Sequence, residues 1–263
     1  MELGLKNKVA LITGASKGIG LASAEILASE GTNLILVARN LDRLKDISRK
    51  FKKIYNSTVI CISSDLSLKN SADMIVEQAL NEFERIDILI NSAGASKAGV
   101  FEELMDEDWE NALNLKFLGA VRMVRAILPI MKKQKYGKII NVAGNTGRQP
   151  HPNFLTGSAA NAALLAFTKG ISEHIIGDGI FINALQPGPT KTEHWDQLME
   201  KLSRNSELDS EEFEKEFLKQ IPMRRIAEPI EMAKTIIFLV SDASTFMTGR
   251  SVTVDGGWTK ELA

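Results

Sequence analysis

Seven short runs of β-branched and other apolar residues recur along this chain, and segments with helical periodicity separate most of them. Runs without polar alternation are typical of strands buried on both faces of a sheet, and helical crossovers make neighbouring strands parallel. The sequence therefore predicts an α/β fold, a doubly wound seven-stranded parallel sheet with helices on both faces. The predicted strands are residues 9–13, 33–37, 58–62, 86–91, 138–142, 180–185 and 251–254.

The chain reads as a single domain, residues 1–263, because no Pro/Gly/Ser-rich linker and no internal repeat divides it. The heavily charged segment 192–220 lies between the sixth and seventh predicted strands, either as a solvated helical excursion or as a lid over the ligand edge of the sheet. Spacings of three and four residues predict apolar stripes on its helices, which favour a hydrophobic small molecule as ligand. The stripe residues are Met199, Leu202, Phe213 and Phe217.

Composition excludes several classes of function. A formal net charge of −1 gives no electrostatic basis for binding nucleic acid or an anionic membrane. No apolar run reaches the roughly 18 residues of a membrane span, and the N-terminus carries no apolar signal segment. Cys61 is the sole cysteine, so disulfides within the chain and cysteine-based zinc sites are excluded, and no metal site is predicted. We expect a cytoplasmic protein.

The segment "VALITGASKGIG", residues 9–20, combines a strand, a glycine-rich turn and the start of a helix. Its glycines permit a tight turn, close approach of the backbone to a pyrophosphate, and close packing of the helix on the strand. The helix N-terminus supplies unpaired N–H groups for the anion. The pattern predicts a Rossmann-like dinucleotide site whose turn residues are Gly14, Ser16, Lys17, Gly18, Ile19 and Gly20.

The end of the second predicted strand indicates which dinucleotide binds. A site for NAD usually has an acidic residue there for the ribose 2′-hydroxyl. This strand reads "LILVARN", with Ala38 in place of the acid and Arg39 beside it, and Lys17 adds a cation on the same side. The alternative is that both cations are solvated surface residues. A missing carboxylate and two cations favour a 2′-phosphate, and therefore NADP(H).

Together with further motifs, these features make the chain similar to the short-chain dehydrogenase/reductase family, in its classical group. The similarity implies hydride transfer between NADP(H) and a carbonyl or alcohol, and assembly as a homodimer or homotetramer. In chain order, the motifs are "TGASKGIG" (13–20), Asp65 in "SSDLS", "NSAG" (91–94), Asn114 in "NALNLKFLGA", "KIINVAG" (138–144), "INALQPGPTKTE" (182–193) and "TGRSVTVDGG" (248–257).

The resemblance also implies further cofactor contacts on three loops. One loop would lie near the adenine, one would line the floor of the cofactor site, and one would pass the nicotinamide. The residues are Asp65 and Leu66 for the first, Asn91, Ala93 and Gly94 for the second, and Pro187, Gly188, Thr190 and Thr192 for the third.

The catalytic positions depart from the family pattern. The family uses a tyrosine whose pKa is lowered by a lysine one helical turn later, a serine that holds the substrate oxygen, and an asparagine that maintains a water relay. When "NAALLAFTKG" is aligned with the family, Gly144 replaces the serine, Gly157 replaces the tyrosine and Asn161 replaces the lysine. Asn114 persists as the asparagine. We expect Gly157 to leave a space where the phenol would stand.

No other tyrosine restores the proton donor. Tyr55 and Tyr136 are the two tyrosines of the chain, and each precedes a predicted strand. In a parallel sheet that places them at the edge away from the ligand. His151 and His194, in loops on the ligand side, are candidates to replace the acid, because histidine titrates near neutral pH. Asn161 could still bind the nicotinamide ribose.

Three functions remain open from the sequence. The first is an oxidoreductase with a rearranged proton relay, acting on a carbonyl, an alcohol or an imine-type substrate that needs no proton during hydride addition. The second is a redox-inactive NADP(H)-binding protein: a sensor, a scaffold or an inactive partner in an oligomer. The third is a non-redox isomerase or cyclase that uses the nucleotide as a structural ligand.

Overall fold

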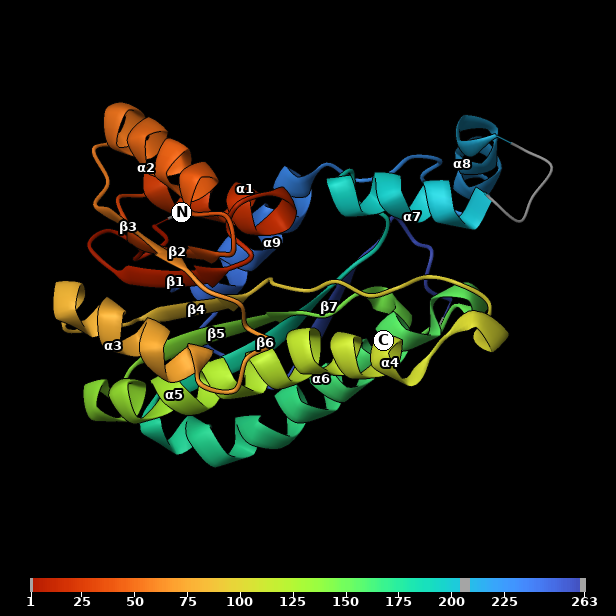
Figure 1. Ribbon diagram of the computed structural model, residues 1–263. Helices are drawn as coiled ribbons and strands as arrows, with labels where there is room; N and C mark the ends of the chain where they lie inside the picture. Colours follow the sequence, from red (N-terminus) through yellow and green to blue (C-terminus); the bar gives the residue numbers. More distant parts are fainter. Residues whose placement is uncertain (1, 204–208, 261–263) are drawn as a thin grey trace.

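A computed structural model describes residues 2–203 and 209–260 and shows one parallel sheet covered by helices (Figure 1). The strand order is β3-β2-β1-β4-β5-β6-β7. The predicted doubly wound fold is confirmed, and each predicted strand lies within two residues of an observed one. The strands are β1 (Val9–Thr13), β2 (Asn33–Ala38), β3 (Val59–Ser63), β4 (Ile88–Asn91), β5 (Gly137–Val142), β6 (Ile180–Pro187) and β7 (Ser251–Val254).

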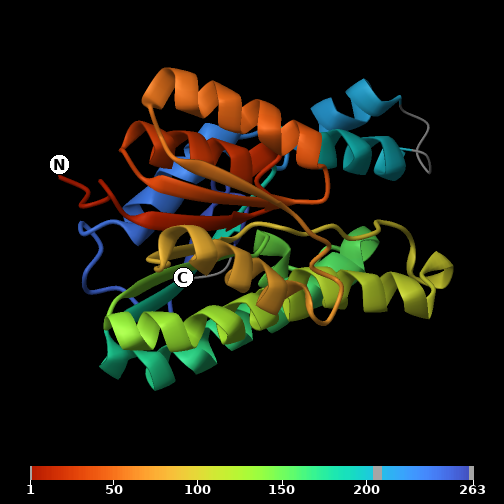
Figure 2. The same cartoon turned by 60° about the vertical axis from the view of Figure 1, so that its left-hand side comes forward.

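Helices cover both faces of the sheet (Figures 1 and 2). One layer is α1 (Gly18–Ser29), α2 (Leu41–Tyr55) and α9 (Pro229–Val240), and the other is α3 (Ser71–Phe83), α5 (Gly119–Gln134) and α6 (Leu155–Ile175). A short helix α4 (Asp106–Ala112) and a π-helical turn η2 (Leu113–Leu118) lead directly into α5. Within the described ranges, none of the helices has the length and apolarity needed to cross a bilayer.

The continuous apolar runs arise because both faces of each central strand are buried. In β1, Ile12 packs toward α1, α2 and α9, whereas Leu11 packs toward α3 and α5. In β2, Leu36 likewise packs toward α1, α2 and α9, and Ile35 packs toward α3 and α5. Successive side chains of a strand point to opposite faces, so a strand covered by helices on both sides has no polar position.

The strand order reverses between β1 and β4, which places a switch point at the carboxyl edge of the sheet. The register pairs Thr13 with Asn91, and Asn91 with Asn141, so β1, β4 and β5 end level with one another. The loops that follow these strands therefore emerge side by side. They are the loops in which the sequence predicts most of the site residues.

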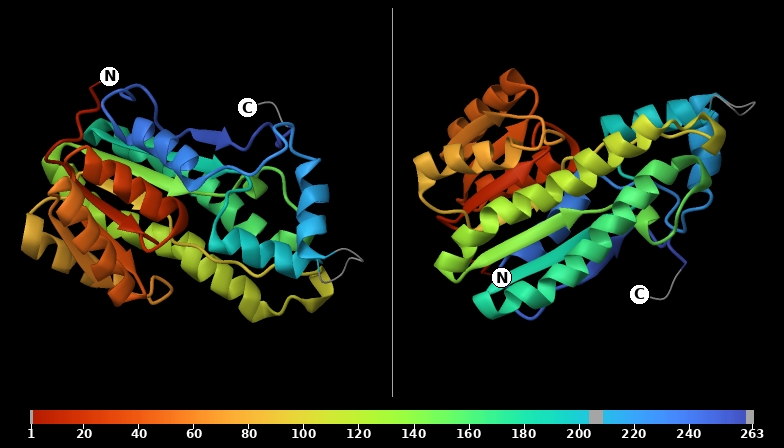
Figure 3. Two further views of the ribbon diagram at one scale, coloured as in Figure 1. Left: turned by 90° about the horizontal axis from the view of Figure 1, so that it is seen from above. Right: turned by 60° about the horizontal axis from the view of Figure 1, so that its bottom comes forward.

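The charged segment 192–220 forms two helices, α7 (Glu193–Ser203) and α8 (Ser210–Leu218), at one end of the molecule (Figure 3). Residues 204–208 of this segment lie outside the described residues. The predicted stripe residues belong to one apolar cluster, in which Trp195, Met199, Phe217 and Ile221 are buried and Leu202 and Phe213 pack against them. The stripes therefore cover one another, and they give no independent support for a hydrophobic ligand.

Candidate functional site

The glycine turn after β1 lies directly against the loop after β4. Gly14 has a φ of +67°, and a Cβ there would lie 2.9 Å from the backbone of Ser92 and Ala93, so only glycine allows this approach. The Thr13 hydroxyl accepts hydrogen bonds from the N–H groups of Ser92 (3.1 Å) and Ala93 (3.2 Å). These contacts fix the predicted floor residue Ala93 beside the turn.

The loop after β6 crosses the beginning of α1. A Cβ at Gly18, where φ is +56°, would lie 3.2 Å from Cγ2 of Thr192. The hydroxyl of Thr192 accepts a hydrogen bond from the N–H of Trp195 (3.2 Å), which links this loop to the first turn of α7. At the other end of the loop, the hydroxyl of Thr190 donates to the carbonyl of Gly188 (2.9 Å). The predicted nicotinamide loop thus faces the predicted pyrophosphate turn.

Close packing explains two further glycines. A Cβ at Gly20 would lie 2.5 Å from the carbonyl oxygen of Gly14, and a Cβ at Gly188 would lie 2.5 Å from Cβ of Asp255. Pro187 ends β6, and the N–H of the next residue, Gly188, donates to the carbonyl of Val254 (3.0 Å), which holds Gly188 next to the chain that leaves β7. Ser16 and Ile19 lie in the turn and the first turn of α1.

The two cations that the sequence predicts to bind a 2′-phosphate differ in their contacts: Lys17 is ion-paired, whereas Arg39 is exposed. Nζ of Lys17 lies 2.7 Å from Oε2 of Glu193, the first residue of α7. Arg43 of α2, which the sequence analysis did not single out, holds the other oxygen of the same carboxylate at 2.9 Å. These bonds, first from Lys17 and then from Arg43, lower the pKa of Glu193. Arg39 is exposed. Glu193 therefore joins the glycine turn and α2 to α7.

Two residues predicted to contact the cofactor, Asp65 and Asn91, form side-chain hydrogen bonds with other residues of the protein. Oδ1 of Asp65 accepts from the backbone N–H (2.9 Å) and the hydroxyl (2.7 Å) of Ser67, and these bonds lower the pKa of Asp65. The next residue, Leu66, is buried. The Asn91 side chain is buried and donates to Oδ1 of Asn141 (2.9 Å). These side chains stabilise the loops of the site through hydrogen bonds and packing within the protein.

Asn161, at the expected lysine position, binds the loop after β5. Its Oδ1 accepts from the N–H of Gly144 (3.0 Å), and its Nδ2 donates to the hydroxyl of Thr146 (2.9 Å). A Cβ at Gly144 would lie 2.8 Å from that Nδ2. Asn161 is only 1% exposed, so both ends of its amide are committed to this loop. Its contact with a ribose stays a prediction.

The expectation of a space at Gly157 is wrong, because the ring of Phe154 fills it. A Cβ at Gly157 would overlap the Phe154 ring. The ring is largely buried and packs against the imidazole of His194, with 6.3 Å between ring centroids. Phe154 was missed in the sequence, although it precedes Gly157 by three residues and so lies about one helical turn away.

His151 is partly buried, whereas His194, in the first turn of α7, is exposed overall with its ring against Phe154. Burial lowers the pKa of His151, whose Nδ1 accepts from the N–H of Asn153 (3.3 Å). For His194, burial and then the positive charges of Lys116, Lys17 and Lys201 lower the pKa to about 4. A group with that pKa is neutral at pH 7. His194 also lines a cleft of about 320 Å³ with Ala95, Ser96, Lys97, Ala98, Asp108, Asn111, Ala112, Gln197, Leu198 and Lys201.

The turn η2 carries Asn114 and a lysine that the sequence analysis passed over. Oδ1 of Asn114 accepts a long hydrogen bond from Arg122 (3.4 Å). The stem of Lys116 lies along the predicted floor residue Gly94, where a Cβ would be 3.3 Å from Cδ of the lysine. Burial lowers the pKa of Lys116 to about 8. The available signal was a single lysine in the stretch "LNLKFLG", in which Asn114 is the other polar residue.

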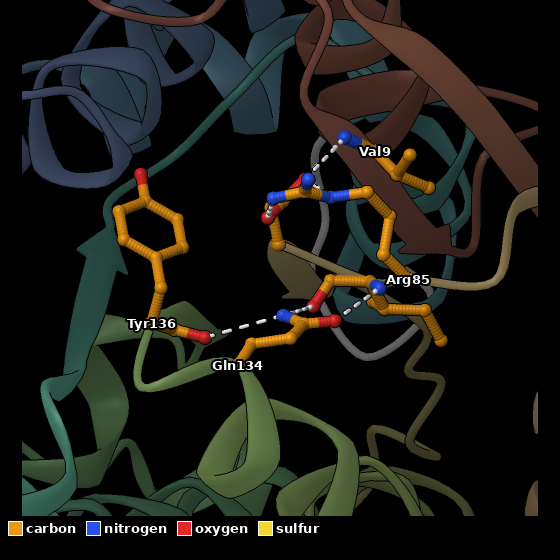
Figure 4. Close-up of polar contacts among 6 residues, drawn as sticks. Val9, Arg85, Gln134 and Tyr136 are labelled. Atoms are coloured by element: carbon orange, nitrogen blue, oxygen red, sulfur yellow. Dashed lines mark hydrogen bonds and ion pairs between the residues drawn. The ribbon is translucent and has the colours of Figure 1, made fainter.

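The tyrosines lie at the amino edge of the sheet, as predicted. Tyr136 directly precedes β5, and its carbonyl accepts from the side chain of Gln134 (3.3 Å; Figure 4). Its hydroxyl is buried without a hydrogen-bond partner among the described residues, and burial raises its pKa to about 12. Tyr55 ends α2 and packs on Phe51. Neither phenol reaches the loops described above.

Comparisons with known proteins agree with this geometry. A family model described as Enoyl-(Acyl carrier protein) reductase matches residues 14–259. The chain is 33% identical to the uncharacterized oxidoreductase YvrD of Bacillus subtilis (strain 168) over the full length of both. It is 29% identical to the NADPH-dependent reductase BacG of the same organism, covering 98% of this chain and 100% of BacG. The crystal structure of L-sorbose reductase from Gluconobacter frateurii, complexed with NADPH and L-sorbose, has a TM-score of 0.93 at 34% identity and covers 100% of each chain.

Proposed function

Because this chain belongs to the short-chain dehydrogenase/reductase family, we propose that it is an NADP(H)-dependent oxidoreductase. The reaction is hydride transfer to or from a carbonyl, alcohol or imine-type small molecule, with a proton relay that does not use the family's tyrosine. One observation carries the proposal. The loops after β1, β4 and β6 converge at Gly14, Ala93 and Thr192 around the N-terminus of α1.

The residues present fit the cofactor. In the described structure no side chain caps the N-terminus of α1, so its first N–H groups are available to a pyrophosphate. Gly14 and Gly18 keep the turn free of side chains at the point of closest approach. On the adenosine side, the absence of an acid at Ala38 and the charges of Lys17 and Arg39 suit a 2′-phosphate. When bound, NADPH supplies the hydride.

The proposed relay is non-standard because Gly144, Gly157 and Asn161 take the places of serine, tyrosine and lysine. Phe154 supports this, since its ring fills the volume beside Gly157. His151 and His194 remain the candidates from the sequence, with Asn114 as a positioning residue. The lowered pKa of each histidine favours a neutral imidazole. In that form the histidines orient a water or pass a proton on, and they do not store one.

The occupied catalytic positions favour a second candidate function, a redox-inactive NADP(H)-binding protein. Asn161 and Phe154 are both engaged by the protein itself, so the expected catalytic positions hold no acid. Such a protein would bind the cofactor and report its presence, or support a partner. An isomerase or cyclase that keeps the nucleotide as a structural ligand would need the same binding residues.

For assembly, we propose a homodimer or homotetramer built on α5 and α6. These long helices run side by side on one outer face of the molecule (Figures 1 and 3). Leu164 of α6 is buried against Ala120 and Ala143, while Leu165 and Phe167 are only partly buried in the same cluster. A second copy would cover these residues. Light scattering after gel filtration measures the assembly, and a monomer would contradict this proposal.

Cofactor binding and turnover test the proposal in sequence. Fluorescence titration should give NADPH a Kd at least about tenfold below that of NADH, since charge-assisted bonds to a 2′-phosphate contribute about 1.5–3 kcal/mol. The double variant Lys17→Ala/Arg39→Ala should abolish the preference. Loss of NADPH absorbance is then followed with L-sorbose, diacetyl, a cyclic imine and a quinone. Turnover of any of them supports the oxidoreductase, whereas tight binding without turnover supports the redox-inactive protein.

A further inference from the structure

Lys116 is a charged residue of the ligand edge that the proposed function leaves without a role. It lies in the π-helical turn η2, two residues after Asn114. π-Helical turns are rare and occur frequently at functional sites. The turn interrupts the helix that α4 and α5 would otherwise form, and so it fixes the direction in which Lys116 leaves the backbone.

The lysine stem lies on the floor of the cofactor site. Cδ, Cγ and Cε of Lys116 lie 3.3, 3.4 and 3.5 Å from the position of a Cβ at Gly94. Gly94 follows Ala93, whose N–H is held by Thr13 at the end of β1. A side chain larger than a hydrogen at position 94 would press on the lysine. The stem of Lys116, which η2 carries, therefore lies against the loop that the sequence predicts to lie under the cofactor.

The ammonium of Lys116 has no partner within the described ranges, and burial is the sole cause of its lowered pKa. Neighbouring lysines differ in this respect. Nζ of Lys97 is ion-paired with Asp108 (2.6 Å), and Nζ of Lys17 is paired with Glu193 (2.7 Å). Lys116 is partly buried, and a charge withdrawn from water is normally paired, because desolvation without a partner is costly. An unpaired ammonium beside a cofactor floor is free to interact with a ligand.

We propose that Lys116 is the proton donor of this site and acts in place of the missing tyrosine. The inference rests on the proposed oxidoreductase function. In the reducing direction, the substrate C=O π bond breaks as its carbon gains a hydride from NADPH and its oxygen gains a proton from Nζ of Lys116. The products are the alcohol, NADP⁺ and a neutral lysine amine. The amine regains a proton from solvent, to which the partly exposed Lys116 side chain has access.

The acidity of Lys116 suits this role. An ordinary lysine has a pKa of about 10.4 and releases a proton poorly at neutral pH. With a pKa of about 8, Lys116 is mostly protonated at pH 7 and close to the optimum for a general acid. Reduction should therefore slow as the pH rises through about 8, whereas oxidation should speed up. The elements around it also carry charged groups, among them Lys17, Lys97, Asp108, Arg122, Glu193, His194 and Lys201, and none of these contributes to the lowered pKa of Lys116.

Competition labelling locates the ammonium without requiring turnover. Trace acetic anhydride reacts with neutral amines, so the rate of labelling between about pH 6 and about pH 10 reports each lysine's pKa. Lys116 should be half-reactive near pH 8 and should be protected by saturating NADPH. Lys133, exposed on α5, is the matched reference and should be unaffected by NADPH. A rate of Lys116 labelling that is the same with and without NADPH would overturn the proposal.

Substitution then tests proton transfer. Lys116→Met keeps the stem and removes the ammonium. With a substrate found in the panel, kcat should fall about 10²–10⁴-fold, the size of a general-acid contribution, while the Kd for NADPH changes little. The decline of the remaining rate above pH 8 should disappear. Lys116→Arg should give intermediate activity with no decline near pH 8, because guanidinium stays charged. Lys133→Met is the control.

The outcomes separate this inference from the proposed function. If the wild-type protein turns over and Lys116→Met retains both kcat and the decline above pH 8, Lys116 is not the donor and the oxidoreductase assignment stands. If the wild-type protein reduces none of the panel, the oxidoreductase assignment fails and the donor role fails with it, whatever the labelling gives.

Discussion

The two edges of the parallel sheet are built on different principles. At the amino edge, buried Asp87 accepts from the backbone N–H of Val9 (2.9 Å) and pairs with Arg85 (2.6 Å). Gln134 then binds both backbone groups of Ile86 (Figure 4). These bonds connect the starts of β1, β4 and β5. An edge cross-linked in this way contributes stability, and the groups that form these bonds are occupied within the protein.

At the carboxyl edge, side chains bind the backbone of the loops that follow the strands. Asn161 holds the loop after β5, Thr13 holds the loop after β4, and Thr192 connects the loop after β6 to α7. Among the residues that the structure describes, the ammonium of Lys116 has no ion-pair or hydrogen-bond partner there. The difference suggests that substitutions at the amino edge change the free energy of unfolding, whereas those at the carboxyl edge also change ligand binding. The following predictions test that division.

The largest effect on stability is expected for Asp87→Ala. The substitution leaves Arg85 without its carboxylate and the buried N–H of Val9 without an acceptor. The unpaired buried N–H costs about 1–3 kcal/mol, and loss of the ion pair, in which Arg85 is half-exposed, adds up to about 1 kcal/mol. Urea unfolding followed by circular dichroism measures the loss, and NADPH affinity of the folded fraction should not change. Glu173→Gln, in an exposed pair with Lys169, is the control. A loss no larger than that of the control would contradict the cross-linked edge.

Asn161→Ala should have the next largest effect and should act on both properties. It leaves the N–H of Gly144 without its acceptor, which costs about 1–3 kcal/mol. The freed loop should also weaken NADPH binding. Thr146→Val, which removes only the second partner of the amide, is the control and should cost less. Reduced stability with unaltered NADPH binding would show that this contact is purely structural.

Gly157→Ala should reduce stability by about 1–2 kcal/mol, because overpacking against Phe154 outweighs the better helix propensity of alanine. The same change in a Phe154→Ala background should be neutral or stabilising. A double-mutant cycle of thermal unfolding measures the coupling between the two positions. Additive effects would mean that the Phe154 ring does not occupy the expected tyrosine position in solution.

The smallest effect is expected for Glu193→Gln. The substitution removes the carboxylate that occupies Lys17 and Arg43, and exposed ion pairs contribute at most about 1 kcal/mol. Both cations then become available to a 2′-phosphate. NADPH should bind about two- to fivefold more tightly at low salt, with no change for NADH and a smaller gain at high salt. Weaker NADPH binding would instead mean that Glu193 helps to close α7 over the cofactor.

Predictions from the sequence succeeded where the physics is local. Strands such as residues 9–13 and 251–254 were found from apolar runs, because the pattern of side chains along a strand depends only on neighbours in sequence. The turn around Gly14 was found from the conformations that glycine permits. The position of Tyr136 followed from strand direction alone. Asn161 was assigned by aligning "NAALLAFTKG" with the family, and Gly157 by its spacing from Asn161, although the contacts of Asn161 were not predicted.

The tertiary structure decided which side chains meet. Lys17 and Glu193 are 176 residues apart in sequence, and no local pattern links them. The stem of Lys116 contacts Gly94 only because the sheet brings the loop after β4 to η2. Phe154 fills the space at Gly157 because η4 (Pro152–Phe154) turns its ring inward. Periodicity and turn chemistry act over a few residues, so the sequence by itself determined the strands, the helices and the glycine turn. The partners of each charge and ring depend on packing across elements, which only the folded chain defines.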